Sequence, residues 1–280
     1  MIRQMLVGID GSDYSEAAMQ YGLHLAQTFA ATLHGLHVVD IVQVESPFLY
    51  DLAGAIGAAP QLNLTGHMQQ ALELRGQHLL HQLHQVCEAS HVPCVTHLST
   101  GVVPTEIVRY AQGMDLVILG RGGLHTRLSK ALLGSAVEAV VRQGAKPTLV
   151  TTYNYYEVRK PLLATDGSPS AVAALHFAAQ FVQALGLPLR VVHCAPSQAA
   201  GQACLHAAEA HLAAYPIDCE VALCRGNAHE DLVHYILEQG CDLLFMGAFG
   251  HRRLVAWVLG STTQYLLRMS PGPILLCHGA

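Results

Sequence analysis

The feature that most constrains this chain is an internal repeat. The opening segment RQMLVGIDGSDYSEAAMQYGLHLA is echoed by KPLLATDGSPSAVAALHFAAQFV, which begins at residue 160. Later segments recur in the same order: LHGLHVV with LPLRVVHC, GMDLVILGRGG with GCDLLFMGAFG, and GAKPTLVTT with SPGPILLCH. A repeat of this length predicts two similar domains, at residues 1–152 and 160–280, joined by a short linker near TYNYYEVR.

The spacing between matching residues locates an insertion in the first half. Asp10 and Asp166 are 156 residues apart, whereas Asp115 and Asp242 are 127 apart. About thirty residues that follow the second apolar run are therefore missing from the second half. They fall within residues 40–91, where SPFLYDLAGAIGAAPQ predicts a Gly/Ala-rich loop ahead of a long helix. We interpret residues 46–60 as a candidate lid or partner contact whose partial deletion leaves folding intact.

Each half alternates short apolar runs with helical patterns. The first-half runs are MLVGI, LHGLHVV, PCVTHLS, DLVILG and TLVTT, and the helical patterns include SEAAMQYGLHLAQTFA and PTEIVRYAQ. This alternation predicts βα units around a parallel sheet that is buried on both faces. The expected fold class is α/β, with two tandem doubly wound domains. Each is expected to be a five-stranded parallel sheet with helices on both faces and a ligand site beyond the carboxyl ends of its strands.

Composition and charge exclude several classes of function. The chain is 51% hydrophobic and 12% charged, and its net charge of −5 includes only three lysines. This leaves no basic field for nucleic acid and no polybasic segment for a membrane surface. No apolar run is long enough to span a bilayer, and the first residues do not resemble a signal peptide. We therefore expect a cytoplasmic protein whose eight cysteines, none in a CxxC pair, are reduced.

A glycine-rich stretch follows the fourth apolar run of each half. In GAFGHRRLVAWVLGST two glycines stand three apart, and after nine residues a third is followed by Ser and Thr. Such glycines let the backbone approach a ligand, and the start of the next helix offers N–H groups and hydroxyls to phosphates. Turns and helix caps explain the same residues, and the Asp-Gly-Ser segments, without a ligand. Because the set recurs twice on one sheet edge, we favour the binding interpretation.

These residues resemble a known family. The second-half stretch fits the G-x2-G-x9-G-(S/T) pattern of the ATP-binding universal stress proteins, and the DGS, HVV or HCA and P-x-L segments also look like that family over nearly the whole chain, twice. The resemblance implies a tandem member with an adenine nucleotide alpha hydrolase-like fold. In the second half it assigns Asp166 to the adenosine part of ATP, the Cys194 backbone to adenine, Gly247 to the ribose, and Gly250, Gly260, Ser261 and Thr262 to the phosphates. The matching first-half positions are Asp10, Val38, Gly120, Gly123, Gly134 and Ser135.

The first half departs from the family pattern, because ten residues rather than nine separate Gly123 from Gly134. The extra residue is either absorbed in the loop or displaces the residues that would bind the phosphates. Cations lie in both loops, and they are either phosphate partners or solvated loop residues. These cations are Arg127, Lys130, Arg252 and Arg253.

Other catalytic and metal-binding motifs are absent from the sequence or incomplete. There is no GxxxxGK[ST], GxGxxG or GxSxG motif. The histidines of HEDLVH, at residues 229–234, are five apart and point in different directions on a helix, so they cannot share a metal. His78, His81 and His84 are interpreted as a solvated helix face, whereas Cys94 and His97 fall on opposite sides of a strand. No metal is therefore assigned to the series that these residues form with Cys87 and His91. Many histidines also suggest sensitivity to pH.

The resemblance implies a stress-response regulator that binds Mg-ATP, has little or no catalytic activity, and acts on an unidentified protein partner. It also implies that the last strands, TLVTT and PILLC, join either two chains in a homodimer or the two halves of one chain in a pseudo-dimer. Two alternatives remain open. One is a nucleotide-independent protein-interaction module of the same fold. The other is an adenylyl- or phosphoryl-transfer enzyme, for which the sequence shows no evident general base or carboxylate cluster near the glycine stretch.

Overall fold

The structure is a computed structural model that describes residues 2–44, 64–123, 133–143, 146–195, 197–226, 229–249 and 259–279. Its elements repeat in the two halves of the chain. The first half contains β1 (Gln4–Gly8), α1 (Asp13–Phe29), β2 (Thr32–Asp40), α2 (Ile41–Val44), α4 (Leu64–Ala89), β3 (Cys94–Gly101), α5 (Val103–Ala111), β4 (Leu116–Gly120), α6 (Ser135–Gln143) and β5 (Thr148–Thr151). The second half contains β6 (Pro161–Ala164), α7 (Pro169–Leu185), β7 (Leu189–Ala195), α8 (Gln198–Leu212), β8 (Cys219–Arg225), α9 (Glu230–Gln239), β9 (Leu243–Gly247), α10 (Ser261–Met269) and β10 (Ile274–Cys277).

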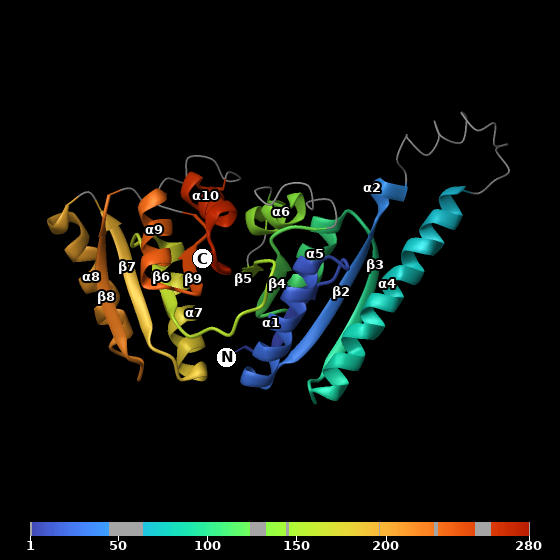
Figure 1. Ribbon diagram of the computed structural model, residues 1–280, viewed down its shortest axis with the longest axis horizontal. Helices are drawn as coiled ribbons and strands as arrows, with labels where there is room; N and C mark the ends of the chain where they lie inside the picture. Colours follow the sequence, from blue (N-terminus) through green and yellow to red (C-terminus); the bar gives the residue numbers. More distant parts are fainter. Residues whose placement is uncertain are drawn as a thin grey trace.

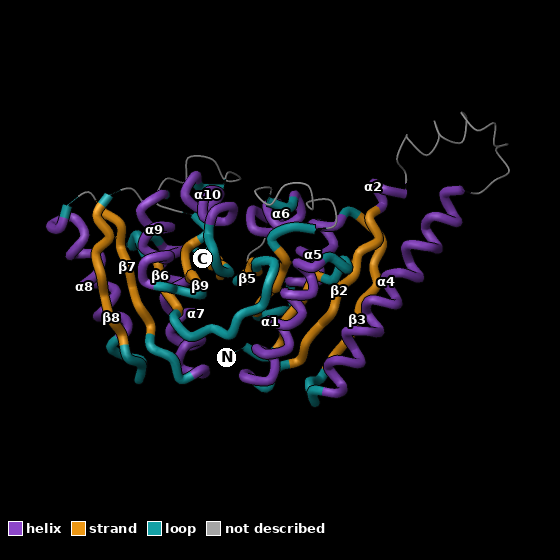
Figure 2. The backbone as a smooth tube through the Cα atoms, viewed as in Figure 1, coloured by secondary structure: helices purple, strands orange, loops and turns teal. Residues whose placement is uncertain are grey.

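The described strands form one continuous sheet (Figure 2). Its strand order is β3-β2-β1-β4-β5-β10-β9-β6-β7-β8, with five strands from each half. Neighbouring strands within each half are parallel, as the alternation of strands and helices predicted. The halves meet where β5 pairs antiparallel with β10, with Leu149 opposite Leu275. The predicted fold class is therefore confirmed. Of the two arrangements considered for the last strands, the structure has the one in which β5 and β10 pair within the chain.

Helices cover both faces of this sheet (Figure 1). On one face α1, α4, α7 and α8 bury residues such as Tyr21, Leu83 and Leu175 against the strands. On the other, α5, α6, α9 and α10 bury Ile107, Val137 and Leu266. Successive residues of a strand point to opposite faces of the sheet, and both faces are covered by helices. Most positions of β1 and β4 are therefore apolar and buried. None of the described helices combines the length and apolar character that a membrane span requires.

Two aspartates hold the edge of the sheet opposite the candidate site. The side chain of Asp115 accepts hydrogen bonds from the backbone N–H groups of Arg3 and Gln4, at 2.8 and 3.0 Å. Asp242 accepts the matching bonds from the backbone of Arg159, at 2.8 Å, and of Lys160, at 2.9 Å to the nearer carboxylate oxygen. These two repeated aspartates therefore satisfy the free amides at the start of each first strand.

The long helix α4 and the shorter α8 occupy the same position in the two halves. Gly76 of α4 packs against His37 and Leu98, and Gly201 of α8 packs against His193 and Leu223 in the same way. A Cβ at Gly76 would come within 2.4 Å of the His37 ring, and one at Gly201 within 2.2 Å of Leu223. The segments RGQHLL and AGQACL are thus equivalent, which places the insertion of the first half between β2 and residue 75.

Candidate functional site

The Asp-Gly-Ser segments form the same turn at the carboxyl ends of β1 and β6. Gly11 and Gly167 have φ of 78° and 75°, a left-handed conformation that favours glycine. The hydroxyls of the serines that follow them, Ser12 and Ser168, cap α1 and α7 by accepting from the backbone N–H groups three residues later. The turn-and-cap interpretation is therefore correct for these segments, and any ligand role adds to it.

The aspartate of each turn accepts hydrogen bonds from the turn through one of its carboxylate oxygens. Oδ1 of Asp10 accepts from the backbone N–H of Ser12 at 2.8 Å and from its hydroxyl at 2.6 Å. Oδ1 of Asp166 accepts from the N–H of Ser168 at 2.9 Å. The other oxygen of Asp10, Oδ2, lies 2.8 Å from the position that a Cβ of Gly123 would occupy. The turn thus places a carboxylate directly against the first-half glycine segment.

A histidine on the second strand of each half ties that strand to the same turn. Nδ1 of His37 lies 2.7 Å from the carbonyl oxygen of Ile9, and Nδ1 of His193 lies 2.6 Å from that of Thr165. Because carbonyl oxygens only accept, each Nδ1 carries the proton. Burial lowers the pKa of His37, which favours the neutral ring. These histidines position the carboxyl ends of β1 and β6 next to their neighbouring strands.

The first-half residues come together around one cavity of about 540 Å³. Five of the six predicted first-half positions line it: Asp10, Val38, Gly120, Gly123 and Gly134. The sixth, Ser135, begins α6 beside the cavity, next to the lining residues Ala136 and Val137. The site therefore has the amino end of a helix on one side and the ends of β1, β2 and β4 on the other.

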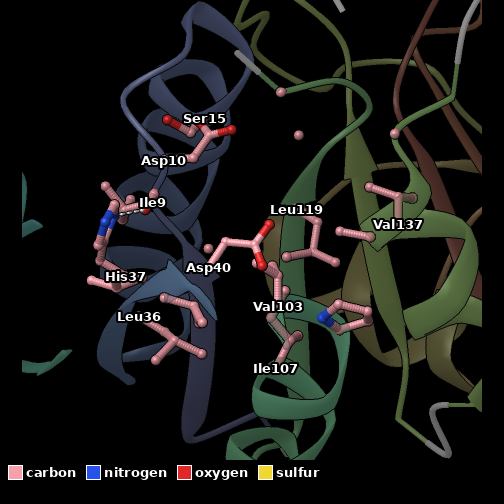
Figure 3. Close-up of a pocket in the computed structure, with 18 of the residues that line it drawn as sticks. Ile9, Asp10, Ser15, Leu36, His37, Asp40, Val103, Ile107, Leu119 and Val137 are labelled. Carbon is pink, nitrogen blue, oxygen red and sulfur yellow. Dashed lines mark hydrogen bonds between the residues drawn. The ribbon is translucent and has the colours of Figure 1, made fainter. Parts of the chain in front are cut away.

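The sequence analysis missed several residues of this cavity (Figure 3). Asp40 ends β2 and points its carboxylate toward Leu119 and Val103. Arg75 of α4 lines the cavity as well, and its Nη2 lies 3.3 Å from the carbonyl oxygen of Asp10. Apolar walls come from residues such as Leu36, Val103, Pro104, Ile107 and Val137. Chain folding thus adds a second carboxylate, Asp40, to the cavity that the predicted Asp10 already lines.

Close packing requires some glycines of the two stretches but not others. A Cβ at Gly120 would come within 2.8 Å of the backbone of Tyr14, and one at Gly247 within 2.7 Å of the backbone nitrogen of Ala171. These glycines let α1 and α7 pack closely on the strand ends. Gly260, by contrast, has an ordinary φ of −59°, and among the described residues its Cβ would meet only the Thr263 hydroxyl, at 3.7 Å. Neither backbone strain nor packing explains that glycine.

The second-half positions lie at the corresponding edge. Asp166 follows β6, Cys194 is on β7, Gly247 ends β9, and Gly260, Ser261 and Thr262 begin α10. Burial raises the pKa of the Cys194 thiol, which sits opposite Cys224 of β8. The hydroxyl of Ser261 lies 3.3 Å from Nε2 of His229. Gly250 and the four loop cations Arg127, Lys130, Arg252 and Arg253 lie outside the described residues.

The histidine groups are dispersed in the structure. His78, His81 and His84 are all exposed on α4. His229 stacks on Tyr265, whereas His234 pairs with Glu238 at 3.0 Å. His34 and His97 stack on neighbouring strands, with Nδ1 of the first 3.1 Å from Nε2 of the second. Within the described part of the chain, no three His, Cys, Asp or Glu side chains gather in an arrangement that could hold a metal ion.

Comparisons with known proteins agree with this architecture. The model of the universal stress protein family matches residues 1–152 and 195–278. A universal stress protein of Synechocystis sp. is 30% identical over 289 residues, which cover 98% of this chain and 99% of the relative. Another, from Methanocaldococcus jannaschii, is 29% identical over 54% of this chain and 82% of its own length.

Solved structures show the same fold. The crystal structure of a universal stress protein from Archaeoglobus fulgidus covers 98% of this chain and 98% of its own, with a TM-score of 0.77 at 22% identity. The family match therefore extends over both halves, in an architecture that other chains share from end to end. This chain belongs to the universal stress protein family, as a member that carries two copies of the family's fold.

Proposed function

We propose that this protein binds ATP, with Mg²⁺ accompanying the phosphates, and acts as a stress-response regulator through nucleotide occupancy rather than turnover. The observation that carries the proposal is the first-half cavity, where the predicted contact residues of β1, β2 and β4 meet the amino end of α6. Its volume of about 540 Å³ lies within the range of small-molecule sites.

The part of the cavity near the end of β2 suits a flat, largely apolar base. Val38 and Val39 line it from the strand, and Val103, Pro104 and Ile107 line it from the start of α5. Backbone groups at a strand end are available to hydrogen-bond the edge of a base. Asp10, at the neighbouring strand end, suits the hydroxyls of a ribose, because a carboxylate accepts hydrogen bonds from them.

The opposite part of the cavity suits phosphates. Gly134, Ala136 and Val137 place the first turn of α6 on its wall, and the N–H groups of a first helical turn have no partner within the helix. The helix dipole adds partial positive charge at this end. Bound ATP would supply the negative charge that this end of the helix stabilises. Arg75, on another wall, adds a cation.

The second half repeats the strand ends and the helix start of this site, and we propose a second nucleotide site there. Gly260 precedes α10 as Gly134 precedes α6, and Thr262 matches Ala136. The space beside Gly260 supports this proposal, because its φ does not demand glycine and no described residue packs closely where its Cβ would lie. The second-half glycine stretch also keeps the nine-residue spacing of the family motif.

Charge substitutions at the two matching helix starts test the proposal. Ala136→Glu places a carboxylate in the first turn of α6, where the helix dipole stabilises it but phosphates are repelled. Mg-ATP affinity of the first half should fall at least about tenfold. Ala136→Gln, a neutral control of the same size, should bind nearly as the natural protein does. Thr262→Glu and Thr262→Gln form the same pair in the second half.

Binding is measured by calorimetric titration with Mg-ATP, and co-purified nucleotide is measured by chromatography after denaturation. Full binding in all four variants would contradict the assigned sites. No nucleotide and no binding in the natural protein would favour the interaction module. Conversion of ATP to ADP or AMP, measured by chromatography on the same samples, tests the regulator, because an adenylyl- or phosphoryl-transfer enzyme would turn the nucleotide over.

A further inference from the structure

Arg121 occupies a special place within the first-half glycine segment. It stands between Gly120 and Gly122, directly after β4. Its backbone forms hydrogen bonds with the end of β5 and with the residue before α6. Its N–H donates to the carbonyl oxygen of Thr151, at the end of β5, at 2.9 Å. Its own carbonyl oxygen accepts from the N–H of Gly134, immediately before α6, at 2.9 Å. A shift of Arg121 would therefore move the start of the helix on the cavity wall.

The side chain of Arg121 leaves the first half and reaches the second. Its Nη2 donates to the carbonyl oxygens of Ser270, at 2.8 Å, and Gly272, at 3.3 Å. Its Nη1 donates to that of Arg268, at 3.3 Å. These carbonyls belong to the last turn of α10 and the turn that follows it. The carboxyl end of a helix carries partial negative charge and free acceptors, so it stabilises a guanidinium.

This contact is partly buried, and its geometry is specific to arginine. Burial lowers the pKa of Arg121, so the charge depends on the carbonyls that surround it. Its Nε is also buried and has no hydrogen-bond partner among the described residues. The planar fork lets two nitrogens reach three carbonyl oxygens at once, which the single ammonium of lysine matches poorly.

The second half has no equivalent of this side chain. The matching segments are GRGG and GAFG, so Ala248 stands where the first half has Arg121. The contact thus runs in one direction, from the glycine segment of the first half to the end of α10. The other end of α10 begins at Ser261, after the glycine of the second-half motif. One helix therefore connects the Arg121 contact with the second predicted phosphate site.

We propose that Arg121 is a positioning residue, which fixes the first-half glycine segment and the start of α6 by anchoring them on the carboxyl end of α10. Its link to nucleotide binding rests on the proposed function. The anchor itself does not, because its hydrogen bonds join parts of the protein alone. The two parts can therefore be tested separately.

The first experiment measures amide hydrogen exchange without nucleotide. In Arg121→Gln, amides of residues 133–138 and those of Ser270, Gly272 and Ile274 should exchange faster, because Gly134 and the end of α10 lose a shared anchor. Amides of β7, on the far side of the second half, should exchange as before. Arg121→Lys should give an intermediate rate. Arg159→Gln, which removes an exposed arginine from the linker, is the control. Unchanged exchange at residues 133–138 would overturn the anchor.

The second experiment adds Mg-ATP in a Thr262→Glu background, in which binding by the second half is weakened, at a concentration that fills the first-half site. Nucleotide should slow exchange at residues 266–274 of the second half, and Arg121→Gln should abolish this slowing and weaken binding at least tenfold. A merely structural residue would not transmit occupancy to α10. Persistence of the slowing, or unchanged affinity, would overturn the positioning role. If the background protein binds no nucleotide, the first-half site fails, and the first experiment still decides the anchor.

Discussion

At the scale of single residues, glycines at different places of the same motif serve different purposes. Gly120 and Gly247 leave room for the backbones of α1 and α7, since a Cβ at either would come within 2.8 Å of backbone atoms. Gly260 meets no such obstacle. The family motif therefore combines a glycine required for packing with one whose missing side chain leaves open space, and stability measurements separate the two.

Gly247→Ala should destabilise the protein by about 1–3 kcal/mol, because the added methyl forces α7 away from the end of β9. Gly260→Ala should cost less, about 0.5–1 kcal/mol, because alanine adopts its φ of −59° without strain but is a poorer N-cap residue than glycine at the start of α10. Urea denaturation followed by circular dichroism measures both. Equal losses in the two variants would contradict this distinction.

Buried histidines predict that acid destabilises the protein. His278 lies between the halves, with Nε2 2.7 Å from the carbonyl oxygen of Val141, and burial lowers its pKa below the ordinary 6.5. As pH falls through about 6.5, the unfolded chain takes up a proton before the folded one does, so stability declines until the folded-state pKa is passed. The pKa values of His34, His37 and His97 are lowered in the same direction.

His278→Gln isolates one part of this effect. The glutamine amide can still donate to Val141, but it does not titrate. The melting temperature of the variant should therefore decrease less than that of the natural protein between pH 7.5 and pH 5. Scanning calorimetry at several pH values gives the two slopes. Parallel slopes would show that His278 contributes nothing to the acid sensitivity.

At the scale of elements, the two halves differ most between the second and third strands. In the first half β2 leads to α2 and then to the 26-residue α4, whereas β7 leads to the 15-residue α8. The equivalence of Gly76 and Gly201 aligns Arg75 with Ala200, so only the first half has an arginine at this position of the helix. The half that contains the insertion thus also has a charged residue, Arg75, on the wall of its cavity.

Deletion of residues 50–60 should leave the melting temperature and cooperativity of the protein unchanged. The segment lies outside the described residues, and the two ends that flank it, α2 and α4, contact each other. A shorter connection can therefore join them at little entropic cost. Differential scanning calorimetry measures the outcome, and loss of a cooperative transition would show that the segment belongs to the core.

At the scale of the whole molecule, the halves share one sheet and one core. Ile274, Leu275 and Leu276 of β10 are fully buried and pair with β5 on one side and β9 on the other. Phe29 of α1 also lies against Phe181 of α7, with ring centroids 5.5 Å apart. Because these contacts join residues of both halves, neither half buries its last strand alone.

The two halves should therefore unfold in one cooperative transition. Leu275→Ala should cost about 2–5 kcal/mol and lower the melting temperature of the entire protein. The control Leu237→Ala, at a site that is 60% exposed, should change stability by about 0.5 kcal/mol or less. Calorimetry with hydrogen exchange follows both halves at once. Separate melting of the halves in the natural protein would contradict a shared core.

The sequence by itself determined the architecture of each half and the edge where its site lies. Repeated segments with matching Asp10 and Asp166, and alternating apolar runs, specify βα units because these signals are local and periodic. They also place Asp10, Gly120, Gly123 and Gly134 at one sheet edge, because the ends of parallel strands meet there, whereas Val38 was assigned by the family resemblance. The pairing of the last strands followed from the family resemblance rather than from these patterns.

Only the tertiary structure decided which distant side chains join that edge. Asp40 and Arg75 gave no motif, and Arg121 looked like any polar residue between glycines. Their roles depend on how far α4 and α10 extend and on which strands pair, and these features are set by contacts between segments far apart in the chain. Local sequence patterns carry periodicity and turn chemistry. They do not carry the distances between elements that are brought together by packing.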